Sequence, residues 1–181
     1  MIDPDLKRSL GQLTYGVNIV ACRRGDLTRA YTSTWTYQLA FDEPIVGISI
    51  SPKHDSYPLI VAEGWFTVSL LAGDQIEPAQ YFSYPGHRFK YVGDYLTEVE
   101  GLPVIADCVA WLYCEVTDRI PIGDHELVVA TVTKVGEGRL AEPALTYSSR
   151  KGWRRADTPA RIPGESVRDR LLEMVDDAEE E

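Results

Sequence analysis

The chain has 181 residues, of which 44% are apolar, so it is long enough for one domain with a real core and too apolar for a disordered protein. Its net charge of −10, without a basic stripe, argues against nucleic-acid binding. No apolar run approaches the roughly 20 residues that cross a bilayer, so we expect a cytoplasmic protein whose partners are small molecules and copies of itself.

The first part of the chain predicts a short helix followed by strands. Apolar residues alternate with polar ones on either side of Gly25-Asp26, which is the pattern of a hairpin. In chain order the expected elements are a helix over 4–11, strands over 14–24 and 27–34, an irregular loop over 35–44 and a strand over 45–51.

The remainder predicts more strands with two short helices between them. Pro58 is tolerated in the first turn of a helix, and Gly64 is typical of a helix end. The expected elements are a helix over 56–64, a strand over 65–71, a helix over 74–84, a strand over 108–118, a return strand over 126–135 and a last strand over 143–149.

Hairpin-linked strands with few helices indicate a mainly β fold, an antiparallel barrel with short helices packed outside. No G-x-G-x-x-G follows a strand, so a dinucleotide-binding parallel sheet is not expected. We expect this domain to span residues 1–155. Residues 156–181 predict a linker and an acidic amphipathic helix, since residues 165–181 hold eight acids and two arginines. That helix either docks on its own barrel or a partner subunit, or is regulatory.

The three cysteines, Cys22, Cys108 and Cys114, have neither the spacing of a disulfide framework nor that of a zinc site. Cys108 and Cys114 are six residues apart and share a face of one predicted strand, so we expect both to be small core side chains, and we expect no metal site.

Residues 51–56 gather hydroxyls, a cation and an imidazole at the expected start of a helix. A helix start offers unpaired N–H groups, and Ser51, Ser56, Lys53 and His54 add donors and charge, which together would suit a phosphate. The alternative is simple helix capping by Ser56 or Asp55, with Lys53 in solvent.

The segment TSTWT (32–36) places three threonines and a serine around Trp35 at a strand end. Irregular backbone there leaves N–H and C=O groups free to bond a planar heterocycle, and Trp35 could pack beside its ring. The alternative is a strand that ends in a loop, with Trp35 in the core. Because no nucleophile motif such as G-x-S-x-G is present, a cofactor is the better source of chemistry.

Over residues 10–150 the chain resembles the flavin reductase-like family, the FMN-binding split barrels that include reductase components of two-component monooxygenases. The resemblance rests on YGVNIVAC, AYTSTWTYQLAFDEPIVGISIS, SPKHDSYPLIVAEGWFTVSLL, QYFS and LPVIADCVAWLYCEVTDRIPIGDHELVVATV, in this order. It implies a split barrel that forms homodimers with the flavin near the interface. It also implies reduction of FMN, or of FAD, by NADH or NADPH, and an oxygenase partner.

The resemblance also assigns residues. The isoalloxazine would lie against residues 34–36 and the phosphate in loop 51–56, and His125 in the G-D-H turn would border the nicotinamide, unless it is an ordinary surface histidine. The expected cofactor-binding residues are Thr32, Ser33, Thr34, Trp35, Thr36, Ser49, Ser51, Lys53, His54, Ser56, Phe82, His87 and Arg88, with His125 as the catalytic candidate.

Two positions depart from the family pattern. Asp55 stands where many relatives carry a cation, so Lys53, His54 or Arg88 must supply the charge for a phosphate. Ser69 stands where relatives carry an amide, so a hydrogen bond to the flavin or to a neighbouring loop is lost. The alternative to an NAD(P)H-dependent reductase is a non-enzymatic FMN carrier or electron-transfer flavoprotein. The hydride donor, the terminal acceptor and whether FMN stays bound are left open.

Overall fold

The computed structural model describes residues 2–84 and 95–155. The predicted linker and acidic helix over 156–181, together with His87 and Arg88, lie outside the described residues. The helices are α1 (Pro4–Leu10), α2 (Tyr57–Glu63) and α3 (Ile76–Tyr81). The strands are β1 (Tyr15–Gly16), β2 (Asn18–Arg24), β3 (Leu27–Ser33), β4 (Thr36–Gln38), β5 (Ile45–Ile50), β6 (Trp65–Leu70), β7 (Leu96–Val99), β8 (Leu102–Ile105), β9 (Ala110–Ile122), β10 (His125–Glu137), β11 (Leu145–Ser148) and β12 (Gly152–Arg155).

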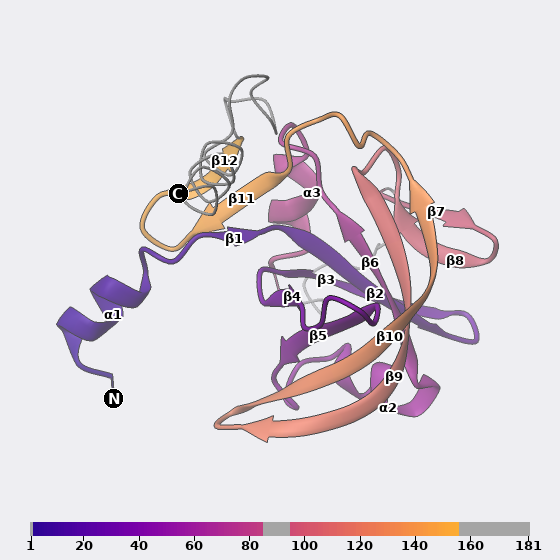
Figure 1. The fold of residues 1–181 in the computed structure, drawn as a ribbon, viewed down its shortest axis with the longest axis horizontal. Coiled ribbons are helices and arrows are strands. Elements are labelled where there is room, and N and C mark those ends of the chain that lie inside the picture. The colour runs from indigo at the N-terminus through magenta and orange to yellow at the C-terminus, as the bar shows by residue number, and fades with distance from the viewer. Residues whose placement is uncertain (1, 85–94, 156–181) are drawn as a thin grey trace, which may run out of the picture.

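Seven strands form one curled antiparallel sheet in the order β3-β2-β6-β9-β10-β5-β4 (Figure 1). The long β9–β10 hairpin runs along it, and its register shifts at Val129/Ala130 and at Val132/Lys134. Such irregularities increase local twist and bend a strand pair, which suits a sheet that curls into a half-barrel. The mainly β, split-barrel fold expected from the sequence is confirmed.

The two edges of the curled sheet, β3 and β4, are joined directly by Thr34 and Trp35. The Thr36 hydroxyl donates to Ser33 Oγ at 2.9 Å across this connection. Ser49 N donates to Trp35 O at 2.9 Å, which ties the same connection to β5, the neighbour of β4 in the sheet. The split in the barrel therefore lies where the sequence places its run of hydroxyl residues.

Four strands were not expected from the sequence. β4 lies within the predicted loop 35–44, the β7–β8 hairpin precedes the predicted strand 108–118, and β12 follows the last predicted strand. The strand predicted over 108–118 is displaced and longer, since β9 begins at Ala110 and reaches Ile122.

The β7–β8 hairpin explains why both faces of β6 are buried. Thr67 donates its hydroxyl to Pro103 O at 2.6 Å, and Ser69 Oγ accepts from Ile105 N at 3.0 Å. Both side chains are at most 1% exposed. Ser69 thus holds a neighbouring hairpin through its hydroxyl, so at this departure from the family pattern a hydrogen bond to a neighbouring segment is present.

The core has two parts. One fills the curled sheet beneath α2 and includes Phe66, Ile48 and Cys114; the other lies under α3 and includes Leu71, Phe82 and Cys108. All three cysteines are free and buried, which the sequence predicts for Cys108 and Cys114. Burial raises the pKa of the Cys22 and Cys114 thiols to about 12, so both stay protonated.

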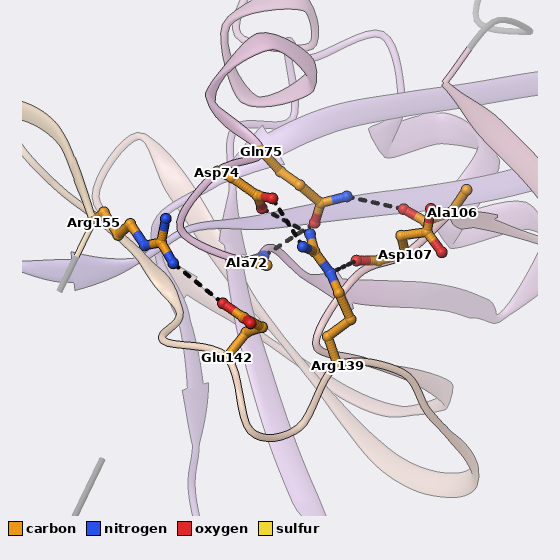
Figure 2. A network of polar contacts seen from close by, with 8 residues as sticks. All are labelled: Ala72, Asp74, Gln75, Ala106, Asp107, Arg139, Glu142 and Arg155. Atoms are coloured by element: carbon orange, nitrogen blue, oxygen red, sulfur yellow. Dashed lines mark hydrogen bonds and ion pairs between the residues drawn. The ribbon is translucent and has the colours of Figure 1, made fainter. Parts of the chain in front are cut away.

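A polar network fastens α3 to the loops around it (Figure 2). Arg139 donates from Nη1 and Nη2 to the Asp74 carboxylate at 2.8 and 2.7 Å, and from Nε to Asp107 O at 2.7 Å. Gln75 donates to Ala106 O at 2.9 Å. Paired guanidinium–carboxylate bonds fix geometry as well as charge, so the network holds the end of β10 against α3.

Candidate functional site

An open pocket of about 310 Å³ lies at the split in the barrel. Its lining residues come from the end of β3 and the β3–β4 connection, from β5 and the loop after it, from the segment after α3 and from the start of β10. They are Tyr31, Thr32, Ser33, Thr34, Trp35, Ser49, Ile50, Ser51, His54, Ser83 and His125. We call this cavity the hydroxyl pocket, because hydroxyl side chains predominate and no carboxylate lines it among the described residues.

Most of the residues expected at the site converge here. Segments 32–35 and 49–54 are far apart in the sequence, and His125 arrives from a third element. The expected residues that line the pocket are Thr32, Ser33, Thr34, Trp35, Ser49, Ser51, His54 and His125. Trp35 is 42% exposed, so the alternative that placed it in the core is wrong.

Four expected residues lie outside the lining. Thr36 borders a different cavity and bonds Ser33, and Phe82 is a core residue at 4% exposure. Phe82 still supports the site, because its carbonyl accepts from Thr32 N at 3.1 Å. Lys53 is exposed on the loop, and Ser56 is buried behind it.

In the loop before α2, residues 51–56, the neighbouring residues contact the His54 ring. Ser56 N donates to His54 Nδ1 at 3.1 Å, while Asp55 Oδ1 lies 3.2 Å from the same nitrogen. Burial lowers the pKa of His54, with Asp55 opposing that shift. The ring is therefore neutral at pH 7, Nδ1 accepts from Ser56, and the proton resides on Nε2. His54 can then offer a hydrogen-bond donor rather than a positive charge.

Tyr31 is a lining residue that sequence reasoning missed. Its ring lies 4.5 Å from that of His54, centroid to centroid, and its side chain is 7% exposed. Burial raises the pKa of its hydroxyl, which stays protonated. The only available signal was its position directly before Thr32, and an aromatic residue in a strand is ordinarily read as core. Ile50 and Ser83 were missed in the same way, each beside an expected residue.

Two buried hydroxyls in this region, Tyr31 Oη and Ser56 Oγ, make no hydrogen bond of ordinary geometry to a described residue. The Ser33 side chain still interacts with Tyr31 Oη and opposes the rise in its pKa that burial causes. Ser56 is the first residue before α2, yet its side chain makes no capping bond, so capping by Ser56 is wrong. Buried hydroxyls without partners cost free energy, and in native proteins they call for an explanation such as a ligand or bound water.

His125 stands beside Trp35 at the edge of the hydroxyl pocket. The two ring centroids are 5.2 Å apart in an edge-on arrangement, and His125 Nδ1 lies 2.8 Å from Asp124 Oδ1. This contact lowers the pKa of Asp124, chiefly through the hydrogen bond. With Nδ1 engaged by the carboxylate, Nε2 is the atom left for a ligand.

Hydrogen bonds tie the turn end of the β9–β10 hairpin to the start of α2. Tyr57 donates its hydroxyl to Glu126 Oε2 at 2.7 Å, and Arg119 Nη1 donates to the same hydroxyl at 3.1 Å. Because Glu126 follows His125 and Tyr57 follows Ser56, these bonds hold the two histidine-bearing segments in a fixed relation.

The part of the chain that the structure describes holds no group of three or more His, Cys, Asp or Glu side chains arranged for a metal ion. Nor does any helix in those residues have the length and apolar character needed to cross a membrane.

Comparison with known proteins gives a consistent result. Residues 10–153 match the flavin reductase-like domain family. The reductase component of 4-hydroxyphenylacetate 3-monooxygenase from Thermus thermophilus is 29% identical over 154 residues, which cover 85% of this chain and 97% of that protein. Diflavin flavoprotein A 1 of Synechocystis sp. is 26% identical over 145 residues, or 78% of this chain and 25% of that protein. The chain spans about a quarter of the length of the diflavin flavoproteins that it matches.

Among solved structures, the NADH:FAD oxidoreductase of Streptomyces globisporus, in complex with NAD and FAD fragments, superposes with a TM-score of 0.75. It is 25% identical, and the match covers 89% of this chain and 99% of that chain. The likeness therefore extends over most of this chain and nearly all of that one.

Proposed function

The chain belongs to the flavin reductase-like domain family, and from this membership we propose that it is an NAD(P)H-dependent flavin oxidoreductase acting on FMN, with FAD as the alternative flavin. Two relatives support the proposal: one is a monooxygenase reductase component, and another is an NADH:FAD oxidoreductase. The alternative, a flavin carrier without reductase activity, has no observation of its own in its favour.

The observation that carries the proposal is the convergence of four separate segments on the hydroxyl pocket. Hydroxyl side chains from 32–34, Ser49 and Ser51 can bond a polar heterocycle and its ribityl chain without adding charge. Functional pockets combine a few directed polar groups with apolar walls, and here Trp35 and Ile50 supply such walls.

The residues present fit a flavin. Tyr31 Oη is a buried donor that makes no hydrogen bond of ordinary geometry to a described residue, in a pocket without carboxylates. A ligand with several acceptor atoms would satisfy it at little cost, since the free protein already bears the penalty of the unpaired hydroxyl. α2 has seven residues, and the amides of Lys53, His54 and Ser56 already donate within the loop, so we assign anion binding to the side chains of Ser51, Lys53 and His54 rather than to a long helix dipole.

When bound, the flavin supplies the hydride-accepting centre, and the protein supplies position and electrostatics. Thr34 would orient the polar edge of the ring system, and Ser51 and His54 would donate from Oγ and Nε2 to the ribityl chain and phosphate. His125, held by Asp124 and Trp35, would border the nicotinamide of the hydride donor. Donors fixed in place before reaction stabilise developing negative charge without reorganisation.

We include a homodimer in the proposal. β4 is an edge strand, and an apolar cavity of about 400 Å³ lies beside it, lined by Tyr37, Val46, Leu112 and Val135 among others. Phe41, just beyond β4, is 100% exposed. Exposed apolar side chains along an open sheet edge support burial against a second copy.

An oxygenase that consumes the reduced flavin belongs to the same proposal, supported by the Thermus relative that is named a monooxygenase component. A cytoplasmic location is also part of the proposal. The three free, buried cysteines support it, because disulfides are rare in the reducing cytosol.

The test is anaerobic reduction. Protein loaded with FMN is mixed with NADH or NADPH while the absorbance of the oxidised flavin is followed. We expect bleaching with at least one nicotinamide. Ser51→Ala should weaken FMN binding by about fivefold, because one neutral hydrogen bond contributes about 1 kcal/mol. Thr133→Val, which removes an exposed hydroxyl bonded to Glu115, is the matched control and should bind FMN normally.

Each result is informative. Protein that binds FMN but reacts with neither nicotinamide would be a carrier, and the reductase proposal would be wrong. Protein that takes up neither FMN nor FAD would contradict the site as well.

A further inference from the structure

A cavity of about 280 Å³ is formed by β11, β12, the turn between them and Thr14, just before β1. Three cations line it, Lys151, Arg154 and Arg155, together with hydroxyl residues such as Thr146. No carboxylate lines it among the described residues. We call this cavity the cationic pocket. It is separate from the hydroxyl pocket, with which it shares no lining residue.

Two of these cations are not neutralised by the described part of the chain. Arg155 forms an ion pair with Glu142 at 3.3 Å (Figure 2). Lys151 and Arg154 are exposed and make no ion pair with any described residue. Arg150, one residue before Lys151, is also without such a pair. Because like charges repel one another, an anion bound here would relieve a repulsion as well as gain an attraction.

Hydrogen bonds fix the backbone that carries the cations. The Thr146 hydroxyl donates to Arg154 O at 3.0 Å, and Lys151 N donates to Ser148 Oγ at 3.2 Å. An anion that binds here therefore has only side chains to order, which lowers the entropic cost of binding.

The segment that follows β12 in the sequence carries the complementary charge. Residues 156–181 hold nine acids and three arginines, which is six of the ten net negative charges of the chain. The last nine residues, 173–181, hold six acids and no cation. These residues lie outside the described part of the chain, so the match rests on their charge and on their place in the sequence.

The length of this segment allows its acidic end to return to the pocket. Eighteen residues separate Arg155 from Glu173, and a flexible chain of that length spans about 23 Å on average. A tethered partner has an effective concentration on the order of millimolar. A single exposed ion pair contributes little, so a lone small anion would be held weakly here, whereas several tethered carboxylates act together.

We propose that the acidic C-terminal residues 173–181 dock on the cationic pocket of the same chain, with their carboxylates beside Lys151 and Arg154. The contact covers the free cations of β12 and of the turn before it, and keeps other polyanions away from them. It does not depend on the proposed function, because it joins two parts of the chain outside the hydroxyl pocket.

The experiment traps the contact as a disulfide in the full chain. One variant combines Thr14→Cys, in the lining of the cationic pocket, with Ala178→Cys in the acidic segment. The matched control combines Thr133→Cys, on β10 and outside that lining, with the same Ala178→Cys. Both threonines are exposed and uncharged, so both variants should fold and keep the net charge. The three natural cysteines are buried and do not compete.

With oxidised glutathione as the oxidant, we expect the disulfide between positions 14 and 178 to form about fivefold faster at low salt than that between 133 and 178. This ratio corresponds to about 1 kcal/mol. It should approach one in 1 M NaCl, where the screening length is about 3 Å. Arg154→Gln should reduce the ratio, and Lys134→Gln, an equal change in net charge away from the pocket, should leave it unchanged.

Equal rates for the two cysteine pairs at low salt would overturn the inference. So would a faster rate at position 14 that neither salt nor Arg154→Gln reduces, because the contact would then not be one of charge. A disulfide that joins two chains instead of one would assign the pocket to the acidic segment of a second copy, and the contact within one chain would be wrong. None of these results bears on flavin reduction, which is tested separately.

Discussion

Replacing Tyr31 by phenylalanine should stabilise the free protein and weaken flavin binding at the same time. The substitution keeps the ring that packs on His54 and removes only the hydroxyl, which is buried and makes no hydrogen bond of ordinary geometry to a described residue. An unsatisfied buried hydroxyl costs about 1–3 kcal/mol, so its removal should raise the melting temperature by at least about 2 °C in a protein of this size.

The same hydroxyl is expected to bond the flavin. Its loss should weaken FMN binding by about fivefold for a neutral acceptor, and by more than about tenfold for a charged phosphate oxygen. Thermal unfolding of the free protein and titration of flavin fluorescence measure the two effects. Thr133→Val, which removes an exposed hydroxyl bonded to Glu115, is the control and should change neither quantity by a comparable amount.

The reasoning would be refuted by the opposite pattern. If Tyr31→Phe lowers the melting temperature and leaves FMN affinity unchanged, the hydroxyl is satisfied within the free protein and does not contact the flavin.

Three further substitutions test other parts of the structure. Arg139→Gln removes the paired bonds to Asp74 and should lower the free energy of unfolding by about 1 kcal/mol, since the pair is partly exposed. Arg139 also lowers the pKa of Asp74 in the folded protein. The stability difference between wild type and variant should therefore disappear as pH falls through that lowered pKa. Gly136→Ala places a Cβ on the Trp111 indole and should cost about 1–3 kcal/mol, with altered tryptophan fluorescence. His54→Gln should flatten the rise of stability with pH just below 6.5, because a histidine whose pKa is lowered on folding stabilises the folded state fully above its unfolded pKa and less as pH falls.

Controls for these variants are available in the same chain. Arg155→Gln removes a single exposed ion pair with Glu142 and should change stability less than Arg139→Gln does. Gly16→Ala adds a Cβ that meets no atom within 4 Å and should leave stability nearly unchanged. An unaltered melting temperature in Gly136→Ala, or identical pH profiles for wild type and His54→Gln, would contradict the packing and the burial described here.

Local patterns predicted the strands that alternate or carry clear turn signals, such as the β2–β3 hairpin around Gly25 and the apolar face of β5. They missed β4 because it has three residues and no apolar alternation, and they missed β8 because Pro103 interrupts it. The second buried face of β6 depends on the β7–β8 hairpin, a contact between distant segments that no local pattern carries.

The site could be predicted where side-chain chemistry was concentrated in the sequence. Hydroxyls at 32–34 and the loop 51–54 are conspicuous, and the structure brings them together with His125. Tyr31 was missed because its function depends on an unsatisfied hydroxyl, which is visible only once its surroundings are known. Ser56 was assigned to the phosphate from its residue type, and the structure buries it behind the loop.

The most direct test of the account is a crystal structure of the protein with FMN. The account predicts flavin in the hydroxyl pocket, within hydrogen-bond distance of Tyr31 Oη, Ser51 Oγ and His54 Nε2. Flavin bound elsewhere, with Tyr31 and His54 bonded only to protein or water, would contradict it.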